Sequence, residues 1–192
     1  MKELEDKILQ DGKVKPGGIL KVDSFLNHQI DPQLLYDMAV ELKRLYEGAG
    51  INKILTVESS GIAIAAMAGY VFSCPLVFAK KSKTRNMADT VWCAEVESFT
   101  HGGSNTIMVS KEYLGPDDCV LIVDDFLADG QAVHALIDLV HQAGGEVVGI
   151  GIAVEKGQQN GGRLLREEGY RLESIAVIEE MDWKTQRIDF RH

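Results

Sequence analysis

Two adjacent acids, Asp124 and Asp125, follow an apolar run in the segment VLIVDDFLADGQA at 120–132. A short loop containing glycine comes next, and then a segment with the pattern of a helix. In open α/β sheets, ligands bind at the carboxyl ends of strands, and the free N–H groups of a helix N-terminus suit a phosphate. Carboxylates beside a phosphate can accept hydrogen bonds from sugar hydroxyls or hold Mg²⁺. Taken alone, two acids after a strand are equally consistent with a solvated turn.

Two further segments have residue types suited to binding an anion. Glu58-Ser59-Ser60-Gly61 follows the apolar run KILTV at 53–57, and small residues at a strand–helix junction let backbone N–H groups approach a phosphate. The same segment is also compatible with an ordinary helix N-cap. Lys80–Arg85 places four cations in six residues of a chain whose net charge is −9. A charge run is most often a solvated loop, but cations in a site would neutralise charge on a leaving group.

Regular elements must hold these segments in place, and the apolar periodicity indicates which ones. Strands are expected where short apolar runs end at polar residues, and helices where apolar residues recur along one face. Their alternation predicts an α/β fold with a mainly parallel sheet flanked by helices. The expected strands are 53–57, 75–79, 91–98, 105–110, 119–123, 146–155 and 172–178, with a turn at 101–104 and a loop at 80–89, and the expected helices are 3–10, 31–45, 62–71, 131–143 and 163–168.

Composition limits the classes of protein that this chain can be. With 192 residues, 45% of them hydrophobic, it forms a single domain over 1–192. The balance of 29 acidic against 20 basic residues argues against a nucleic-acid partner. The longest apolar run, 61–72, is too short to cross a membrane, and the N-terminus lacks the apolar core of a secretory signal. We therefore expect a cytoplasmic protein with no membrane partner.

Several common site motifs are missing from the sequence. The three cysteines, Cys74, Cys93 and Cys119, form no CxxC pair, so neither a disulfide framework nor a zinc site is indicated. The histidines show no HxxxH or HExxH spacing, and no GxxxxGK[ST] loop occurs. The glycines at 149 and 151 lack the third glycine of a dinucleotide fingerprint, because residue 154 is Val.

The whole of 120–132 resembles the phosphoribosyl-pyrophosphate (PRPP) signature of type I phosphoribosyltransferases, in which four apolar residues and two acids precede a loop rich in Gly and Thr. The loop in that family often reads ATGGT, whereas this chain has Ala128-Asp129-Gly130-Gln131-Ala132. Two hydroxyl groups are thereby missing, and Asp129 adds a negative charge. We expect backbone N–H groups to supply most of the phosphate cradle, with Asp129 pointing away from it.

Three more segments resemble the type I phosphoribosyltransferases that act on purines, and in particular the branch that acts on xanthine. They are ILKVDSFLNHQIDP at 19–32, FAKKSK at 78–83 and GIGIAVEK at 149–156. The resemblance runs in collinear order over nearly the full chain. The resemblance implies the type I phosphoribosyltransferase fold with a small hood from about residues 1–30 and 156–192. It implies transfer of phosphoribosyl from PRPP to N9 of xanthine, giving xanthosine monophosphate (XMP) and pyrophosphate. It also implies Mg²⁺ held through PRPP without a direct protein ligand, and a homodimer whose second subunit can add a basic residue to the site.

The resemblance assigns roles to individual residues. Asp124 and Asp125 would hold the ribose hydroxyls and Lys81 would neutralise the leaving pyrophosphate. Loop amides would bind PRPP at two places, and four hood or strand residues would contact xanthine. The PRPP-binding residues are Ser59, Ser60 and Gly61 for the pyrophosphate and Ala128, Asp129, Gly130, Gln131 and Ala132 for the 5′-phosphate; the xanthine-binding residues are Leu20, Phe25, Asn27 and Lys156.

The chemistry of two base-binding candidates agrees with these roles. The Lys156 ammonium donates and cannot accept, so it suits a purine oxygen and opposes the 6-amino group of adenine. Asn27 both donates and accepts, and Phe25 would form an apolar wall. Without the resemblance, the sequence favours a surface lysine at the end of a strand for Lys156 and a turn residue for Asn27. Relatives that use an Asp as general base have it at the position of Ala128, so no general base is identified.

Three other functions share some of these sequence features. An adenine phosphoribosyltransferase would share the PRPP signature. A purine-sensing transcriptional regulator built on the same fold would carry a DNA-binding domain ahead of it, but roughly 30 residues precede the helix expected from Asp31, and the chain is acidic. A scaffold role is disfavoured because several candidate site segments occur together.

Overall fold

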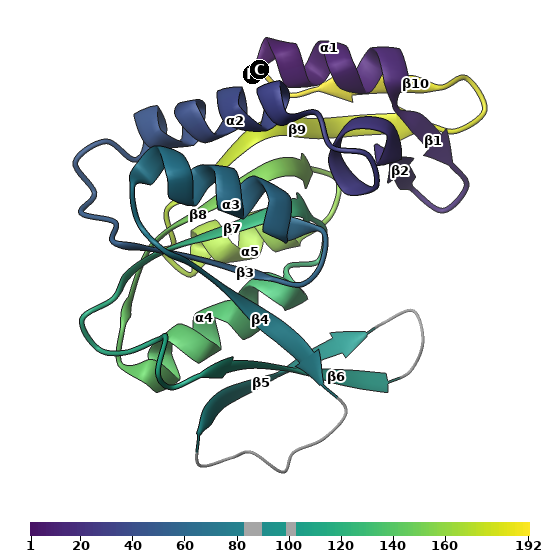
Figure 1. The fold of residues 1–192 in the computed structure, drawn as a ribbon. Coiled ribbons are helices and arrows are strands. Elements are labelled where there is room, and N and C mark those ends of the chain that lie inside the picture. The colour runs from purple at the N-terminus through teal and green to yellow at the C-terminus, as the bar shows by residue number, and fades with distance from the viewer. Residues whose placement is uncertain (83–89, 99–102) are drawn as a thin grey trace.

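A mixed β-sheet forms the centre of the computed structural model, which describes residues 1–82, 90–98 and 103–192 (Figure 1). Within the described residues it has eight strands in the order β10-β9-β8-β7-β3-β4-β6-β5. Neighbours from β9 to β4 run parallel, and β10, β6 and β5 are antiparallel to the strands they pair with. The strands are β3 Lys53–Val57, β4 Leu76–Ser82, β5 Val91–Ser98, β6 Gly103–Ser110, β7 Cys119–Leu127, β8 Glu146–Lys156, β9 Leu172–Asp182 and β10 Arg187–Phe190.

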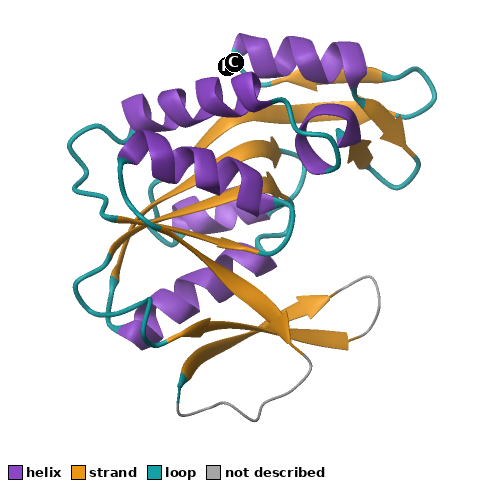
Figure 2. Cartoon of the chain, viewed as in Figure 1, coloured by secondary structure: helices purple, strands orange, loops and turns teal. Residues whose placement is uncertain are grey.

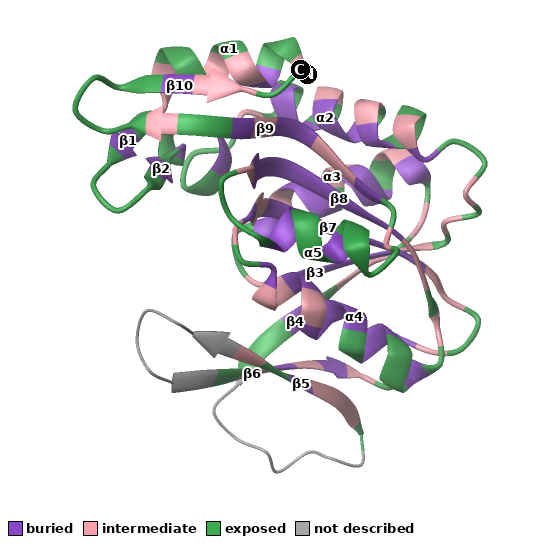
Figure 3. Cartoon of the chain, turned by 180° about the vertical axis from the view of Figure 1, so that it is seen from behind, coloured by how far each residue is buried: buried purple, intermediate pink, exposed green. Residues whose placement is uncertain are grey.

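Helices cover both faces of this sheet (Figure 2). α1 (Lys2–Asp11), α2 (Pro32–Leu45) and α3 (Gly61–Phe72) lie on one side, and α4 (Gln131–Ala143) and α5 (Gly161–Glu167) on the other. β7 alternates between the two cores: Leu121 and Val123 belong to the first, and Val120 and Ile122 to the second. β7 and β8 are buried along most of their length (Figure 3). The predicted α/β class with a mainly parallel sheet is confirmed.

Local signals explain where the helices begin and end. The Asp31 side chain caps α2 by accepting a hydrogen bond from the N–H of Leu34 at 3.2 Å, and Pro32 occupies the first helical position, where its missing N–H costs nothing. α4 spans the residues expected from its periodicity and ends at Gly144, whose φ of 77° is in the left-handed region that glycine adopts freely.

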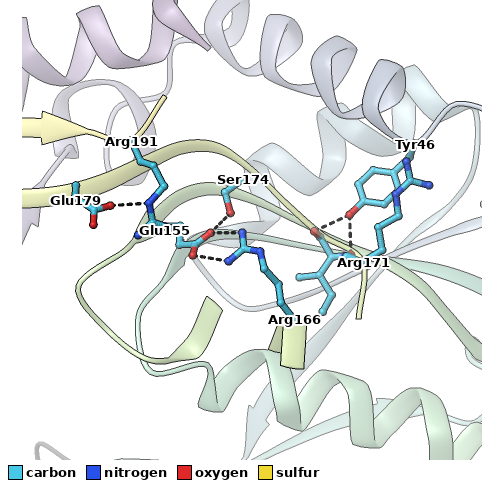
Figure 4. Close-up of polar contacts among 8 residues, drawn as sticks. Tyr46, Glu155, Arg166, Arg171, Ser174, Glu179 and Arg191 are labelled. Carbon is cyan, nitrogen blue, oxygen red and sulfur yellow. Dashed lines mark hydrogen bonds and ion pairs between the residues drawn. The ribbon is translucent and has the colours of Figure 1, made fainter. Parts of the chain in front are cut away.

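Gly149 and Gly151 allow α2 to approach β8 closely. A Cβ atom at 149 would lie 2.2 Å from Cε1 of Tyr46, and one at 151 would lie 2.8 Å from Cδ2 of Leu42. The Tyr46 hydroxyl is 2.8 Å from the carbonyl oxygen of Ile150 and accepts from the N–H of Ile150 at 3.1 Å (Figure 4). The glycines that fail as a dinucleotide motif therefore have a packing role.

Segments from both chain ends lie side by side at one end of the molecule, and we call this part the hood (Figure 1). It contains α1, the hairpin of β1 (Lys13–Lys15) and β2 (Ile19–Lys21), a π-helical turn η1 (Asp23–Asn27), and β10. The Gln186 side chain joins the two ends by accepting from the N–H of Val14 and donating to its carbonyl oxygen, both at 3.0 Å. The Met1 ammonium donates to the carbonyl oxygen of Ile175.

The structure corrects several expected boundaries. Lys80 and Lys81 lie in β4, so the loop expected from residue 80 is wrong for both. β7 continues to Leu127, so Asp124 and Asp125 lie within the strand, and only residues 128–130 separate it from α4. The hairpin, η1 and β10 were not anticipated. Residues 83–89, which include Lys83 and Arg85 of the basic segment, lie outside the described residues. So do residues 99–102, which include the first two residues of the turn expected at 101–104, whereas its last two residues belong to β6.

Within the described part of the chain, no helix combines the length and apolar character needed to span a membrane.

Candidate active site

The carboxyl ends of β3, β7 and β8 meet at one edge of the sheet, because the three strands are parallel neighbours. β3 leads into 58–61, β7 carries the two acids and leads into 128–130, and β8 ends at Lys156. The fold therefore brings the candidate segments to one edge, as the order of elements predicted.

The acid pair is almost completely enclosed. Asp124 is 5% exposed and Asp125 is 6% exposed. The N–H of Asp125 donates to Oδ1 of Asp124 at 3.0 Å. Burial, and then the neighbouring Asp125, raise the pKa of Asp124 well above its ordinary value, while the charge of Lys81 opposes that shift. Donors or a cation brought by a ligand would therefore stabilise the ionised form.

The segment Glu58–Gly61 connects the end of β3 with the acid pair, with β4 and with the start of α3. Ser60 occupies the N-cap position of α3, but its hydroxyl donates to Oδ1 of Asp125 at 3.0 Å and makes no capping bond to the helix. A Cβ atom at Gly61 would lie 2.2 Å from Oγ1 of Thr56 and 2.7 Å from Oδ1 of Asp124. Glycine is therefore required where this segment crosses the end of β7. The peptide bond between Glu58 and Ser59 is cis.

Lys81 lies next to this segment on the neighbouring strand. Its backbone N–H donates to Oε1 of Glu58 at 2.6 Å, and its side chain is exposed. The positive charge of Lys81 counteracts the rise in the pKa of Asp124 and so favours its ionised form. Of the other cations of the basic segment, Lys80 lies in β4, and Lys83 and Arg85 lie outside the described residues.

The loop at 128–130 differs from the expectation in one respect. Asp129 does not point away from the cradle: its Oδ1 accepts a hydrogen bond from the N–H of Gln131 at 3.2 Å. Gly130 has a φ of 87°, which the backbone needs to turn from β7 into α4. One of the N–H groups expected to bind a phosphate is thus already bonded to a carboxylate.

Lys156 lies under the hood. Its Nζ donates to the carbonyl oxygen of Gly18, in the hairpin turn, at 3.2 Å, and lies 5.8 Å from the ring centroid of Phe126. Burial lowers the pKa of Lys156, and the charge of Asp129 counteracts that effect. This half-buried ammonium does not have the surroundings of a solvated surface lysine.

Phe126 is the neighbour of Lys156 that the sequence reasoning missed. It follows the two acids in β7, and its register partner in β8 is Val154, two residues before Lys156. Its position between the acid pair and the phosphate loop was the available signal. A partly buried ring beside an ammonium is suited to stacking against a flat base.

The other base-binding candidates occupy different positions in the hood. Leu20 is buried in β2, and Asn27 is exposed at the end of η1. Phe25 is 1% exposed, with Nζ of Lys7 5.9 Å from its ring centroid. The Phe25 ring therefore packs in the hood core and offers almost no free surface to a base.

Glu155 directly precedes Lys156 in β8, and its side chain faces the opposite side of the sheet. Glu155 is 3% exposed, and its two carboxylate oxygens accept from Nη1 and Nη2 of Arg166 at 2.8 Å each (Figure 4). The Ser174 hydroxyl donates to the same carboxylate at 2.5 Å. Burial opposes the ionised form, but the bonds from Arg166 and Ser174 still lower the pKa of Glu155. Adjacent residues thus place a carboxylate under α5 and an ammonium under the hood.

The carboxylates of the site suit a metal ion that is bound mainly by the phosphates of a substrate. The described residues contain no group of three or more His, Cys, Asp and Glu side chains that could hold a metal. Mg²⁺ usually keeps several waters and binds through one or two carboxylates and substrate phosphates. The enclosed pair Asp124 and Asp125, close to the loop at 128–130 that is expected to bind a phosphate, fits that arrangement.

The chain is similar to known proteins over nearly its whole length. The family model of the phosphoribosyl transferase domain matches residues 22–191. The xanthine phosphoribosyltransferase of Lachnoclostridium phytofermentans is 49% identical over 191 residues, which cover 100% of this chain and 98% of that protein. The protein of the same name from Bifidobacterium adolescentis is 50% identical over 192 residues, covering 100% of both. Among solved structures, an adenine phosphoribosyltransferase from Giardia lamblia complexed with 9-deazaadenine has a TM-score of 0.74 at 23% identity, covering 91% of this chain and 96% of that chain; it shares the fold. The chain belongs to the phosphoribosyltransferase family.

Proposed function

We propose that the protein transfers the 5-phosphoribosyl group of PRPP to N9 of xanthine, giving XMP and pyrophosphate. One observation carries this proposal: the acid pair, the phosphate loop and Lys156 lie at a single edge of the sheet, on the neighbouring strands β7 and β8. Full-length relatives at 49% and 50% identity that are named xanthine phosphoribosyltransferases support the choice of base.

The reaction needs groups that hold PRPP at both ends while the bond from C1 to pyrophosphate breaks. Backbone N–H groups of 128–132 bind the 5′-phosphate, and Asp124 and Asp125 accept hydrogen bonds from the ribose hydroxyls. Amides of 59–61 and the Lys81 ammonium hold the leaving pyrophosphate, whose charge grows in the transition state. Catalysis is therefore mainly positioning and electrostatic stabilisation.

Mg²⁺ bound to PRPP would neutralise part of the pyrophosphate charge, and Asp124 and Asp125 are the residues placed to bind its water ligands or the ribose oxygens. Because residue 128 is Ala, the loop supplies no carboxylate as general base. Xanthine is comparatively acidic, and we infer that it enters with its proton already lost. The Lys156 ammonium would also stabilise that anionic base.

Lys156 would select the base. Its ammonium donates to an oxygen of a 6-oxopurine, whereas adenine presents a donor at that position. Losing one charge-assisted hydrogen bond costs ~1.5–3 kcal/mol, or about 10- to 150-fold in kcat/KM. Phe126 would stack on the ring, and Leu20 and Asn27 would close the site from the hood.

The test is release of pyrophosphate from PRPP and Mg²⁺ with xanthine, guanine, hypoxanthine or adenine. We expect xanthine to be the best substrate, and Lys156→Ala to lose at least about tenfold in kcat/KM for xanthine while narrowing the gap to adenine. Lys111→Ala is the matched control, because Lys111 also lies over an aromatic ring, 4.5 Å from the centroid of Trp92, but outside the site. Preference for adenine, or unchanged selectivity in Lys156→Ala, would overturn the assignment.

A homodimer is also part of the proposal. α3 is apolar around most of its surface, yet Tyr70 is 75% exposed and Ala66 is exposed beside it. An apolar helix face of this kind favours contact with another subunit. A second copy of the chain is the partner we propose, and a cytoplasmic location stays a prediction.

A further inference from the structure

The phosphate loop at 128–130 rests directly on the start of α5. The N–H of Gly161 donates to the carbonyl oxygen of Ala128 at 3.1 Å. A Cβ atom at 161 would lie 2.6 Å from that oxygen and 2.7 Å from N of Gly130. α5 therefore supports the loop from behind.

A second connection runs through His134, in the first turn of α4. Its Nδ1 is 2.9 Å from the carbonyl oxygen of Gly130, and its Nε2 is 3.0 Å from Oε2 of Glu168, just after α5. The backbone N–H of His134 also donates to the Gly130 oxygen at 2.9 Å. One imidazole ring thus joins the loop, α4 and the end of α5.

The chemistry of both contacts requires the ring to donate. A carbonyl oxygen and an ionised carboxylate only accept hydrogen bonds, and a ring nitrogen donates only when it carries a hydrogen. A neutral ring can donate to one of these two acceptors, and both bonds form together only when both ring nitrogens carry a hydrogen. Glu168 holds the ring in the orientation that reaches Gly130.

This loop depends strongly on its backbone geometry. Its sequence, Ala-Asp-Gly-Gln-Ala, has no hydroxyl side chain to bind a phosphate, so backbone N–H groups must do so. Gly130 lies in the left-handed region, and Asp129 adds a charge that repels a phosphate. A small change in the peptide orientation at Gly130 would misdirect the N–H groups.

We propose that His134 is a positioning residue for this reaction: oriented by Glu168 and acting through the carbonyl of Gly130, it fixes the loop in the geometry that binds the 5′-phosphate of PRPP. The proposal rests on the function proposed above for residues 128–132. His134 does not touch the substrate. Its effect is expected on binding of the phosphate end and not on binding of the base or the pyrophosphate.

Two substitutions of similar size separate the two contacts. In His134→Asn the amide nitrogen takes the place of Nδ1 and can still donate to Gly130. In His134→Gln the amide nitrogen takes the place of Nε2 and reaches Glu168 but not Gly130. Glu168→Gln keeps an acceptor without the charge, and Glu167→Gln is the matched control, since Glu167 pairs with Arg163 on the exposed side of α5 at 2.8 Å.

Calorimetric binding of ribose 5-phosphate, which carries only the phosphate end, is compared with binding of pyrophosphate. We expect His134→Gln to weaken ribose 5-phosphate about five- to twentyfold and to raise KM for PRPP similarly, with KM for xanthine unchanged. His134→Asn should stay within about threefold of wild type, Glu168→Gln should lose about two- to fivefold, and Glu167→Gln should change nothing.

Wild-type affinity of His134→Gln for ribose 5-phosphate would overturn the proposal. So would an equal loss of affinity for pyrophosphate, since that would indicate a general disturbance of the fold. The test of His134 does not depend on which base the protein uses. If wild type fails to use xanthine but its affinity for ribose 5-phosphate depends on His134, only the assignment of the base is refuted.

Discussion

At the scale of single residues, Asp124 combines a raised pKa with a central position in the site. Its raised pKa means that the folded protein keeps a proton that the unfolded chain releases near the ordinary Asp value of about 4. The free energy of unfolding must then fall as the pH rises from about 4 through the raised pKa, because the native state binds more protons there. The site is maintained at a cost in stability.

Asp124→Asn removes this ionisation and nearly preserves the shape of the side chain. We expect the variant to be more stable than wild type at neutral pH, with the difference disappearing below about pH 4, where both side chains are uncharged. Turnover of PRPP should fall at least about tenfold, because a hydrogen-bond acceptor for ribose is lost. Urea unfolding across this pH range measures the first effect. Asp138→Asn, on the exposed face of α4, controls for the loss of one negative charge, and equal stability of Asp124→Asn and wild type at neutral pH would contradict the expectation.

Asp129 differs from Asp124, because its negative charge repels the phosphate that the loop at 128–132 is proposed to bind. Asp129→Asn retains the acceptor for the N–H of Gln131 but removes the carboxylate from the phosphate loop. We expect KM for PRPP to fall about two- to tenfold, which is the size of effect for one exposed charge pair. The gain should shrink as salt is added, because salt screens such interactions. Steady-state kinetics at low and high salt test this, and a KM that stays the same or rises would show that Asp129 contributes to binding.

At the scale of elements, the junction between β3 and α3 has no room for a side chain. Gly61→Ala would place a methyl group against Oγ1 of Thr56 and Oδ1 of Asp124. We expect Asp124 and the adjoining amides to move, with kcat/KM for PRPP falling at least about tenfold and binding of pyrophosphate weakened. Gly115→Ala is the control, since no atom lies within 4 Å of a Cβ at that position. Activity retained by Gly61→Ala would mean that the junction tolerates the shift.

Elements defined by local signals were predictable from the sequence. Periodicity and the glycine after Ala143 predicted α4, and the apolar run 53–57 predicted β3. β4 is longer than expected because Lys80 and Lys81 pair with Met108 and Ile107 of β6, a long-range contact that composition does not reveal. The hood elements depend similarly on contacts between the two chain ends.

Within the site, too, the features set by local sequence were predictable and those set by long-range contacts were not. The order of elements was enough to bring 58–61, 124–132 and Lys156 to one edge. Apolar character alone suggested Phe25 as a wall, but it cannot distinguish a ring in the hood core from one beside Lys156, such as Phe126. His134 was overlooked because its partners, a backbone carbonyl and Glu168, lie together only in the folded protein.

At the scale of the whole molecule, the exposed face of α3 tests the proposed dimer. Tyr70→Lys would place a charge on that face without touching the core, since the side chain is 75% exposed. We expect wild type to be a dimer and the variant to dissociate, because a charge buried without a partner opposes association. Light scattering after size-exclusion chromatography measures both. Tyr36→Lys, on α2, is the control, and a dimer unaffected by Tyr70→Lys would place the contact elsewhere.

The opposite orientations of Glu155 and Lys156 in β8 limit how segments of related proteins can be joined in chimaeras. A strand shows successive side chains to opposite faces, so a shift of one residue exchanges the two faces. A one-residue insertion in β8 that no bulge absorbed would carry the carboxylate of Glu155 to the present place of Lys156 and turn the ammonium toward the opposite face. The preference for an oxygen-bearing base would then be reversed with every side chain of the site still present. In chimaeras of this family, spacing within β8 is as much a determinant of specificity as the identity of its last residue.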